Sequence, residues 1–145
     1  MQCVRTNYDD DDIVVLFHNG ANPFVTNEEI KDVITTAREN GAAVVAHPTT
    51  DTIRTVSQNR FSQGAIDRSH LWNMQTPQAM KLDIADAAFA HAREHDFLGT
   101  DDVSLVEEIG GDVVVVSASQ YNFKVTTPLD LLLAEAVLAH TKQNT

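Results

Sequence analysis

The sequence predicts an α/β domain with a parallel β–α–β unit near its start. Three short apolar runs have the composition of buried strands, at residues 13–17, 42–46 and 113–116. Stretches in which apolar residues recur at helical spacing separate these runs, as in α/β folds. With 145 residues, of which 43% are hydrophobic, the chain is long enough for a single domain with its own core.

The charge and composition of the chain limit its partners. Ten Lys and Arg residues face 21 Asp and Glu residues, and the formal net charge of −11 argues against a nucleic-acid binder. Any phosphate site must therefore be built locally from these ten cations. No apolar run approaches the roughly 20 residues of a membrane span, and the N-terminus lacks the features of a signal peptide. The single cysteine, Cys3, cannot form an internal disulfide, which fits a reducing cytoplasm.

The first strand, Ile13–Phe17, is β-branched and continuous, so it is expected to be buried on both faces. Turn-forming residues follow it at 18–23, and a loop at the carboxyl end of a buried strand is a candidate site. His18 in this loop is either a ligand or base, or a packed or turn-bonding histidine, and the second interpretation is favoured.

A helix is expected next, because Thr26 and Glu29 form a capping box and apolar residues follow at helical spacing. Gly41 ends this helix. Residues 42–46 then form a second buried strand, and the crossover between the two strands should be right-handed.

An extended hairpin is expected at residues 52–68. Residues 52–57 alternate, residues 58–64 resemble a polar turn, and residues 65–68 return as a second strand. A hairpin with so few apolar residues is marginal alone and packs on something else, for which a partner subunit is the natural candidate.

A strand–turn–helix junction is expected at residues 67–80. Leu71, Trp72 and Met74 suit a short half-buried strand, which Pro77 should end because it has no N–H to donate. A helix follows with an apolar stripe. His91 and His95 lie four apart on its polar side, and a solvated face is favoured over a zinc pair because no further Cys or His clusters nearby.

The last part of the chain predicts two helices and a strand. Residues 100–102 cap a short helix that ends at Gly110 and Gly111, before the strand at 113–116. Residues 122–126 form a short strand or an extended segment. Thr127 and Pro128 begin a last helix, which should be well buried because residues 131–138 are nearly all apolar.

Five short motifs follow one another along the chain: FHNGANPFVT, TDTIR, DRSHLWNMQTPQAM, TDDVSLVEEIGG and NFKVTTPLDLLLAEAVL. In this order and spacing they resemble the 2-C-methyl-D-erythritol 4-phosphate cytidylyltransferase family, from about Ile13 to about Leu138. The resemblance implies a Rossmann-like, mostly parallel sheet flanked by helices, of the nucleotide-diphospho-sugar transferase type. It also implies transfer of CMP from CTP to a sugar-alcohol phosphate, with Mg²⁺, release of pyrophosphate and a role in isoprenoid precursor synthesis. Ribitol-5-phosphate cytidylyltransferases share this fold and chemistry.

The same resemblance assigns roles to residues of this chain. Arg68 and Lys124 match two cations that position the substrate phosphate for attack on the α-phosphate of CTP, and fixed cations offset the repulsion between two anions. Substrate-binding positions match Thr52, Arg54, Thr76 and Thr100. The hairpin at 52–68 matches the arm that family dimers exchange, so that Arg68 would serve the neighbouring subunit's site.

Two departures from the family matter. The family carries a Gly-rich, triphosphate-holding loop in an N-terminal half, and this chain has no such loop; Cys3-Val4 is expected to align near the last nucleotide contact. In the loop after the first strand, the family's Mg²⁺-contacting aspartate is Asn19 and its arginine is Asn22. The alternative is that both asparagines simply satisfy a turn.

Three interpretations remain: a cytidylyltransferase, whole or as its C-terminal part; a non-catalytic binding or assembly module of the same fold; and an α/β domain whose motifs agree by chance. The triphosphate cradle is absent, so the chain alone should turn over CTP poorly or not at all. We expect a homodimer joined through the hairpin.

Overall fold

The structure is a computed structural model that describes residues 12–143, so the predictions on Cys3 and Val4 lie outside it. The elements, in chain order, are β1 (Val14–Phe17), α2 (Asn27–Asn40), β2 (Ala42–Pro48), β3 (Arg54–Val56), β4 (Ser62–Ala65), the 3₁₀ helix η1 (Arg68–His70), β5 (Trp72–Lys81), α3 (Leu82–Glu94), α4 (Ser104–Glu108), β6 (Val114–Ser117) and α5 (Pro128–Gln143).

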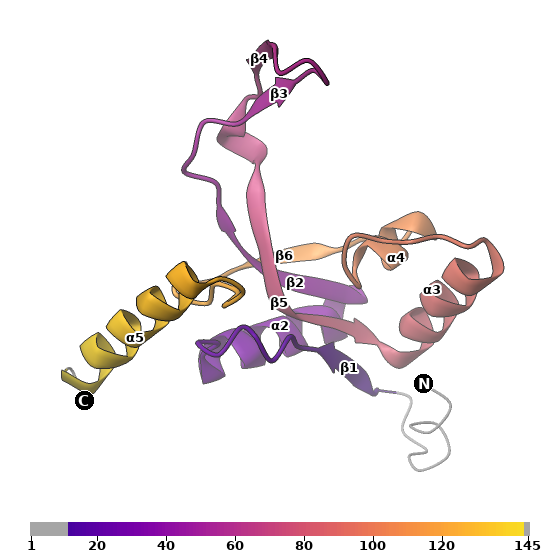
Figure 1. Cartoon of the computed structure of the whole chain (residues 1–145). Helices are drawn as coiled ribbons and strands as arrows, with labels where there is room; N and C mark the ends of the chain where they lie inside the picture. The colour runs from indigo at the N-terminus through magenta and orange to yellow at the C-terminus, as the bar shows by residue number, and fades with distance from the viewer. Residues whose placement is uncertain (1–11, 144–145) are drawn as a thin grey trace.

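A four-stranded sheet lies at the centre, in the order β1-β5-β2-β6 (Figure 1). β5 is antiparallel to both β1 and β2, whereas β2 and β6 are parallel. Three of the four strands therefore run in one direction and β5 runs against them. The expected α/β fold is confirmed, and the antiparallel β5 lies between the two strands of the predicted β–α–β unit. β1 is an edge strand of this sheet with partly exposed residues, so its expected burial on both faces is wrong.

Helices cover both faces of the sheet because the buried strand β2 alternates between them. Ala43 and Val45 face α2 and pack with Val33 and Ala37. On the other face, a second cluster joins β2 and β5 to α3 and α4; its fully enclosed members are Ala42, Val44, Met80, Ala85, Ala88 and Val106. This three-layer arrangement leaves the strand ends free to carry polar loops.

The predicted capping box of α2 is confirmed. Thr26 Oγ1 accepts a hydrogen bond from the N–H of Glu29 at 3.1 Å, and Glu29 Oε2 accepts one from the N–H of Thr26 at 2.8 Å. Gly41 ends the helix with a φ of 100°, and a Cβ at this position would lie 2.7 Å from Ile84 Cδ1. The backbone conformation therefore favours glycine here, and any larger residue would also displace the end of the Ile84 side chain.

The prediction that Pro77 ends strand pairing is wrong. β5 continues through Pro77 to Lys81, and its register against β2 shifts between the pair Val44–Gln78 and the pair Ala46–Met74. Pro77 lies inside this irregular stretch, and the pairing with β1 begins beyond it at Gln78. The missing N–H therefore removes no ladder hydrogen bond, which is how a proline is accommodated in a sheet. The predicted helix follows, and it starts at Leu82.

The last helix is correctly placed, but its predicted burial is wrong. All five of its leucines are about half exposed or more: Leu129 is 64%, Leu131 54%, Leu132 64%, Leu133 49% and Leu138 50% exposed. Ala134, at 6%, is the one buried hydrophobic residue of α5 within the described chain. The apolar residues of α5 surround the helix instead of forming a stripe, so one packed side leaves the others uncovered. No helix among residues 12–143 is long and apolar enough to span a bilayer.

The predicted hairpin is confirmed as a two-stranded sheet that projects from the body (top of Figure 1). All residues of β3 and β4 are exposed, and the strands are shorter than expected. Residues 65–68 do not all continue the second strand, because the Asp67 carboxylate accepts a hydrogen bond from the N–H of Ser69 and caps η1. We call residues 50–70 the arm.

Candidate functional site

A cavity of about 640 Å³ opens at the edge of the sheet where β1, β2 and β6 end. Ligands of open α/β sheets bind at the carboxyl ends of parallel strands, and this cavity has that position. Loops after β1 and β6, the start of β5 and the segment before α4 all contribute to its wall. The lining residues are Asn19, Asn22, His47, Asn73, Met74, Gln75, Thr76, Gln78, Thr100, Asp101, Asp102, Phe123 and Lys124.

Five residues singled out from the sequence meet in this cavity: Asn19, Asn22, Thr76, Thr100 and Lys124. Lys124 is the one Lys or Arg side chain that lines it, and within the described chain its ammonium has no hydrogen-bond or ion-pair partner. An exposed, unpaired ammonium beside two threonine hydroxyls offers an anion both a charge and hydrogen-bond donors.

The Thr76 hydroxyl connects β5 to the loop after β1. Its Oγ1 accepts a hydrogen bond from the N–H of Asn19 at 3.1 Å and lies 3.1 Å from His18 Nδ1. His18 is exposed, lies within hydrogen-bond distance of the Thr76 hydroxyl on β5 and does not line the cavity, so the favoured interpretation of a packed or turn-bonding histidine is wrong. The two contacts fix the Thr76 side chain at the cavity wall.

Asn19 and Asn22 both stabilise the turn after β1. Asn19 Oδ1 accepts a hydrogen bond from the N–H of Ala21 at 3.0 Å, and the N–H of Asn22 donates to the carbonyl oxygen of Asn19 at 2.8 Å. Asn22 is 4% exposed and its Nδ2 donates to the carbonyl oxygen of Asn122 at 2.9 Å. Asn22 therefore adds a long-range bond to the turn that the sequence suggested.

The donor set around Asn19 does not fit a magnesium ion held by the chain itself. Mg²⁺ prefers anionic oxygen ligands in tight octahedral geometry. Asn19 offers one neutral oxygen, which already accepts a hydrogen bond. Among the described residues, no cluster of three or more His, Cys, Asp or Glu side chains has metal-binding geometry. The rings of His91, near the end of α3, and of His95, just after it, stack with centroids 3.9 Å apart, and no third candidate ligand joins them in the described part of the chain.

Two carboxylates in the segment before α4, Asp101 and Asp102, also line the cavity. Asp101 Oδ2 accepts a hydrogen bond from Gln78 Nε2 at 2.9 Å, and Asp101 Oδ1 accepts one from the N–H of Ser104 at 3.1 Å. Burial, and then the negative charge of Asp101, raise the pKa of Asp102 above its ordinary value. Sequence reasoning treated these residues as a helix cap, and Asp101 does cap the first turn of α4. The sequence did not predict that Asp101, Asp102 and His47 line the cavity, because only the folded arrangement of β2 and β5 brings them together.

The arm residues Thr52, Arg54 and Arg68 are not part of this cavity. Arg54 Nη1 donates to Ser62 Oγ at 3.3 Å across the hairpin, and Arg68 Nη1 donates to the carbonyl oxygen of Thr50. All three residues are exposed. One copy of the chain therefore divides the predicted site residues between a cavity and a projecting arm.

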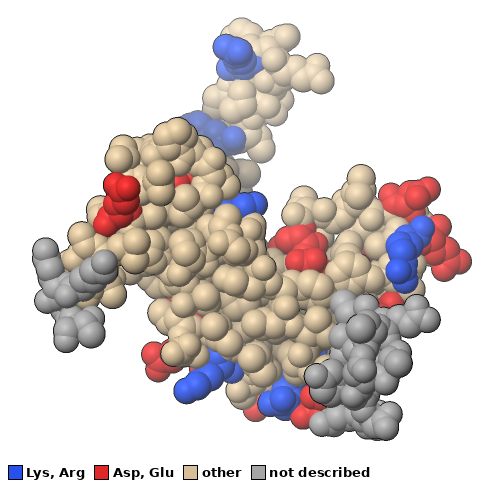
Figure 2. Space-filling model, turned by 60° about the horizontal axis from the view of Figure 1, so that its bottom comes forward, with Lys and Arg blue, Asp and Glu red and all other residues tan. Residues whose placement is uncertain are grey.

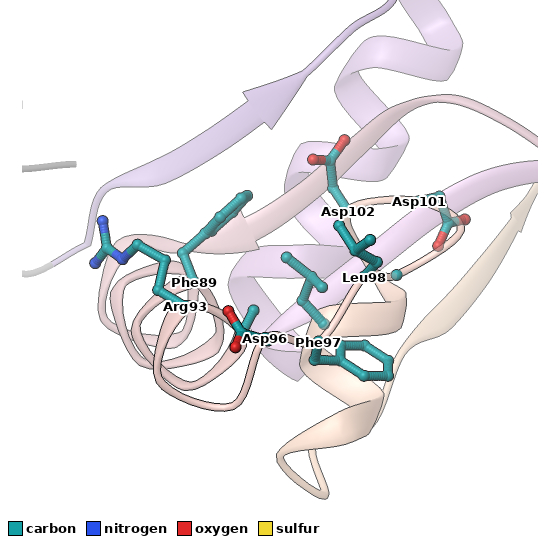
Figure 3. Close-up of a pocket in the computed structure, with 10 residues that line it drawn as sticks. Phe89, Arg93, Asp96, Phe97, Leu98, Asp101 and Asp102 are labelled. Atoms are coloured by element: carbon teal, nitrogen blue, oxygen red, sulfur yellow. The ribbon is translucent and has the colours of Figure 1, made fainter.

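A second cavity of about 650 Å³ lies between α3 and the segment before α4 (Figure 3). Figure 3 shows Asp101 and Asp102 on one side of it and Phe89, Arg93 and Asp96 on the other. Its lining contains three acidic residues against one arginine, so it is less suited to a phosphate than the first cavity. The two cavities share Asp101 and Asp102.

Comparison with known proteins identifies the family. Residues 4–140 match the family described as 2-C-methyl-D-erythritol 4-phosphate cytidylyltransferase. The chain belongs to this cytidylyltransferase family. It is 49% identical to the enzyme of that name from Bacillus licheniformis over 130 residues, which are 90% of this chain and 56% of the relative. With the enzyme from Halalkalibacterium halodurans it shares 46% identity over 132 residues, 91% of this chain and 58% of the relative. The chain thus spans a little over half the length of these relatives.

Solved structures of the family agree with the fold. The cytidylyltransferase of Thermus thermophilus superposes with a TM-score of 0.80 at 33% identity, over 87% of this chain and 62% of that one. The 4-diphosphocytidyl-2C-methyl-D-erythritol synthase of Anaerococcus prevotii gives a TM-score of 0.82 at 29% identity, over 92% of this chain and 60% of that one. The predicted cytidylyltransferase family and its sheet flanked by helices are therefore confirmed.

Proposed function

We propose that the cavity is the acceptor side of a cytidylyltransferase site, where 2-C-methyl-D-erythritol 4-phosphate binds and receives CMP from CTP. In this reaction a phosphate oxygen of the acceptor attacks the α-phosphorus of CTP and forms a new P–O bond. The bond from that phosphorus to the oxygen bridging to the β-phosphate breaks, and pyrophosphate leaves. The product is a CDP-alcohol for isoprenoid precursor synthesis, and we place the reaction in the cytoplasm.

The observation that carries this proposal is the meeting of Lys124, Thr76 and Thr100 in one cavity at the carboxyl edge of the sheet. These residues come from three of the five motifs and are separated by 24 residues or more in the chain. An ammonium and hydroxyl groups in one cavity can together bind a phosphate, and the positive charge offsets its repulsion from the triphosphate.

A second copy of the chain would complete the cation set. The cavity of one copy has one lysine against Asp101 and Asp102, which is a weak site for a phosphate dianion. The arm carries three arginines, Arg54, Arg60 and Arg68, although the chain as a whole is strongly acidic. Figure 2 shows basic side chains on the lobe that projects from the body. We therefore propose a homodimer in which the partner's arm brings its basic residues to this cavity.

Mg²⁺, which the family resemblance implies, would be held here mainly by the phosphates of CTP. Asn19 can offer a neutral carbonyl oxygen and no charge, and magnesium sites in nucleotide enzymes rely on substrate phosphates beside few protein ligands. When bound, the ion supplies positive charge that stabilises the departing pyrophosphate. The part of this chain is to hold the acceptor phosphate through Lys124 and the threonines.

Calorimetric titration of the full chain with 2-C-methyl-D-erythritol 4-phosphate tests the proposal. Lys124→Gln and Arg68→Gln should each weaken binding at least about tenfold, because a charge-assisted hydrogen bond is worth roughly 1.5–3 kcal/mol. A matched control loses the same charge outside the proposed site: Lys31→Gln lies on the exposed face of α2. Equal affinity of the Lys124 and Lys31 variants would exclude the proposed acceptor site.

A non-catalytic binding module is the second candidate function. It is favoured by the neutral donor set around Asn19 and by the absence of a magnesium ligand cluster among the described residues. Pyrophosphate release from CTP and the acceptor distinguishes the two. Binding without turnover supports the module, whereas turnover that Lys124→Gln abolishes supports the enzyme. A competition titration of 2-C-methyl-D-erythritol 4-phosphate against ribitol 5-phosphate shows which of the two acceptors the cavity binds more tightly.

A further inference from the structure

The loop at residues 118–126, which carries the cavity lysine, is hydrogen-bonded to the loop and helix that follow β1. The N–H of Ser119 donates to Glu29 Oε1 at 2.7 Å. Near the other end of the loop, the N–H of Val125 donates to the carbonyl oxygen of Ala21 at 2.7 Å. Because Glu29 is buried and also caps α2, the first contact joins the loop to a rigid helix.

The centre of the loop is fixed by Asn122, which is fully buried. Its Nδ2 donates to the carbonyl oxygen of Thr76 at 2.8 Å. Its own backbone carbonyl oxygen accepts two hydrogen bonds, from Gln75 Nε2 at 3.0 Å and from Asn22 Nδ2 at 2.9 Å. Asn122 thus connects β5 and the loop after β1 to the loop that carries the lysine.

The partners fix the orientation of both amides. Asn122 Nδ2 faces one carbonyl oxygen, and Gln75 Nε2 faces two, since it also donates to the carbonyl oxygen of Ser119 at 3.1 Å. A flipped amide would place oxygen against oxygen. The remaining atoms, Gln75 Oε1 and Asn122 Oδ1, are buried without a hydrogen-bond partner in the described chain. A buried oxygen without a hydrogen-bond partner destabilises the fold, and an apolar side chain would avoid this. The two amides are therefore present for their N–H donors.

We propose that Asn122 is a positioning residue for Lys124, acting through its hydrogen bond to the Thr76 carbonyl. The side chain of Lys124 has no partner of its own in the described chain, so the backbone of its loop sets its place in the cavity. Asn122 lies two residues before it and holds that backbone to the strand that carries the Thr76 hydroxyl. This inference rests on the proposed function, in which Lys124 binds the acceptor phosphate.

The main test variant is Asn122→Ala, which removes the Nδ2 donor without adding a charge near the phosphate. Asn40→Ala is its matched control. Asn40 Nδ2 likewise donates to a backbone carbonyl oxygen, that of Thr36 at 2.9 Å, but it is exposed at the end of α2. Gln75→Met is a second variant that keeps the length of the side chain and removes the other donors, for use if Asn122→Ala does not fold.

Two measurements on the full chain are made for each variant. The first is hydrogen exchange at the amide of Val125, whose protection should fall at least tenfold in Asn122→Ala and stay unchanged in Asn40→Ala. The second is the affinity for 2-C-methyl-D-erythritol 4-phosphate by calorimetry, which should fall at least tenfold in Asn122→Ala. In a Lys124→Gln background the same substitution should change the affinity less than twofold, because the residue through which it acts is gone.

The outcomes separate the two proposals. An affinity unaffected by Lys124→Gln, or no binding by the unsubstituted chain, contradicts the proposed function and this inference with it. If Lys124→Gln weakens binding but Asn122→Ala does not, the positioning role alone is wrong. It is also wrong if Asn122→Ala weakens binding equally in both backgrounds, or if the protection of the Val125 amide does not change.

Discussion

Gln78 on β5 and Val103 before α4 are joined by a hydrogen bond of 2.9 Å, from the N–H of Val103 to Gln78 Oε1. The same side chain donates through Nε2 to Asp101 Oδ2 at 2.9 Å. Gln78 is 2% exposed and Val103 4%, so a buried polar side chain of the sheet holds the segment that forms one wall of the cavity. The hydrogen bonds of Gln78 therefore contribute both to the stability of the fold and to the position of this cavity wall.

Gln78→Ala should destabilise the fold by about 2–3 kcal/mol. It leaves the buried N–H of Val103 without its acceptor, which costs roughly 1–3 kcal/mol, and it adds a small cavity. The free energy of unfolding from urea denaturation measures the change. Gln63→Ala on the exposed strand β4 is the control and should shift it by less than about 0.5 kcal/mol. Equal unfolding free energies for the two variants would show that the Gln78 bonds contribute nothing.

Local interactions made part of this fold predictable from the sequence. The capping box at Thr26 and Glu29 closes within four residues, and its signal is in the residue types themselves. The strand beginning at Ala42 is apolar as far as Ala46, because these five residues are covered on both faces. The hairpin could be placed by its alternation and polar turn, although its strands are shorter than predicted.

Long-range relationships made the remainder unpredictable. Whether Pro77 breaks a strand depends on where β1 and the irregular pairing with β2 lie, which the segment itself does not encode. The exposure of α5 depends on whether a surface covers its leucines, not on their apolar character. The bond from Asn22 to Asn122 joins residues 100 positions apart, so the sequence could suggest the turn at Asn22 but not its partner.

Among the site residues, the motif resemblance selected Thr76, Thr100 and Lys124, which the structure brings together. It also selected Arg54 and Arg68, which lie on the arm, and whose contribution to a cavity stays a prediction about a second copy. His47, Asp101 and Asp102 were not selected as lining residues. Their signal was weak because a histidine after a strand and a pair of acids before a helix are ordinary surface features.

Asp102→Asn should stabilise the fold at neutral pH. Burial and the charge of Asp101 raise the pKa of Asp102 in the folded chain above its ordinary value of 3.8. The stability contribution of such a group is fully present below the unfolded-state pKa and is lost as the pH rises through the folded-state pKa. Asparagine carries no charge at any pH and avoids this loss. The free energy of unfolding of Asp102→Asn should therefore exceed that of the unsubstituted chain at pH 7 and equal it near pH 3. Because the group is partly open to solvent, the gain should stay below about 1 kcal/mol.

Thermal unfolding at a series of pH values checks the sign of this effect. Asp51→Asn on the exposed arm removes the same charge and serves as the control. A stabilisation by Asp102→Asn that is as large at pH 3 as at pH 7 would contradict the assigned cause. So would a loss of stability at pH 7 that the Asp51 variant does not share.

Dimerisation through the arm should depend on its exposed apolar residues. Phe61 is 73% exposed at the hairpin end and Val56 57% exposed on β3, so both can be covered by a partner. Phe61→Ser should weaken the dimer at least about tenfold, since buried aromatic side chains contribute strongly to interfaces. Analytical ultracentrifugation at micromolar concentration measures the dissociation constant. Leu98→Ser is the control, because Leu98 is 94% exposed on the body near α4.

Deletion of residues 58–64 should weaken association further than Phe61→Ser, because it removes Phe61 together with the turn and most of β4, the pairing partner of β3. The fold of the body should not change, since β3 and β4 form a separate two-stranded sheet. A monomer at micromolar concentration with the arm intact excludes the arm as a dimer contact. A dimer that survives the deletion unchanged places the interface elsewhere.

Asn19→Asp should strengthen the binding of magnesium at the loop after β1. Two unit charges of the ion and one of a carboxylate about 2.1 Å apart attract by roughly 16 kcal/mol at an effective dielectric of 20, 332 × 2/(20 × 2.1). Desolvation of both partners removes most of this gross attraction, so the net gain should be about 1–3 kcal/mol. Each 1.4 kcal/mol is a factor of ten, so the dissociation constant should fall about five- to 150-fold.

Calorimetric titration with MgCl₂, alone and in the presence of CTP, measures this change. Asn40→Asp adds the same charge at the exposed end of α2 and controls for non-specific attraction of the cation. The hydrogen bond from the N–H of Ala21 to the side-chain oxygen of residue 19 can persist, because a carboxylate accepts it as an amide does. Equal magnesium affinity of the Asn19 and Asn40 variants would show that this loop is not the metal position, and that the alignment of Asn19 with the family aspartate is wrong.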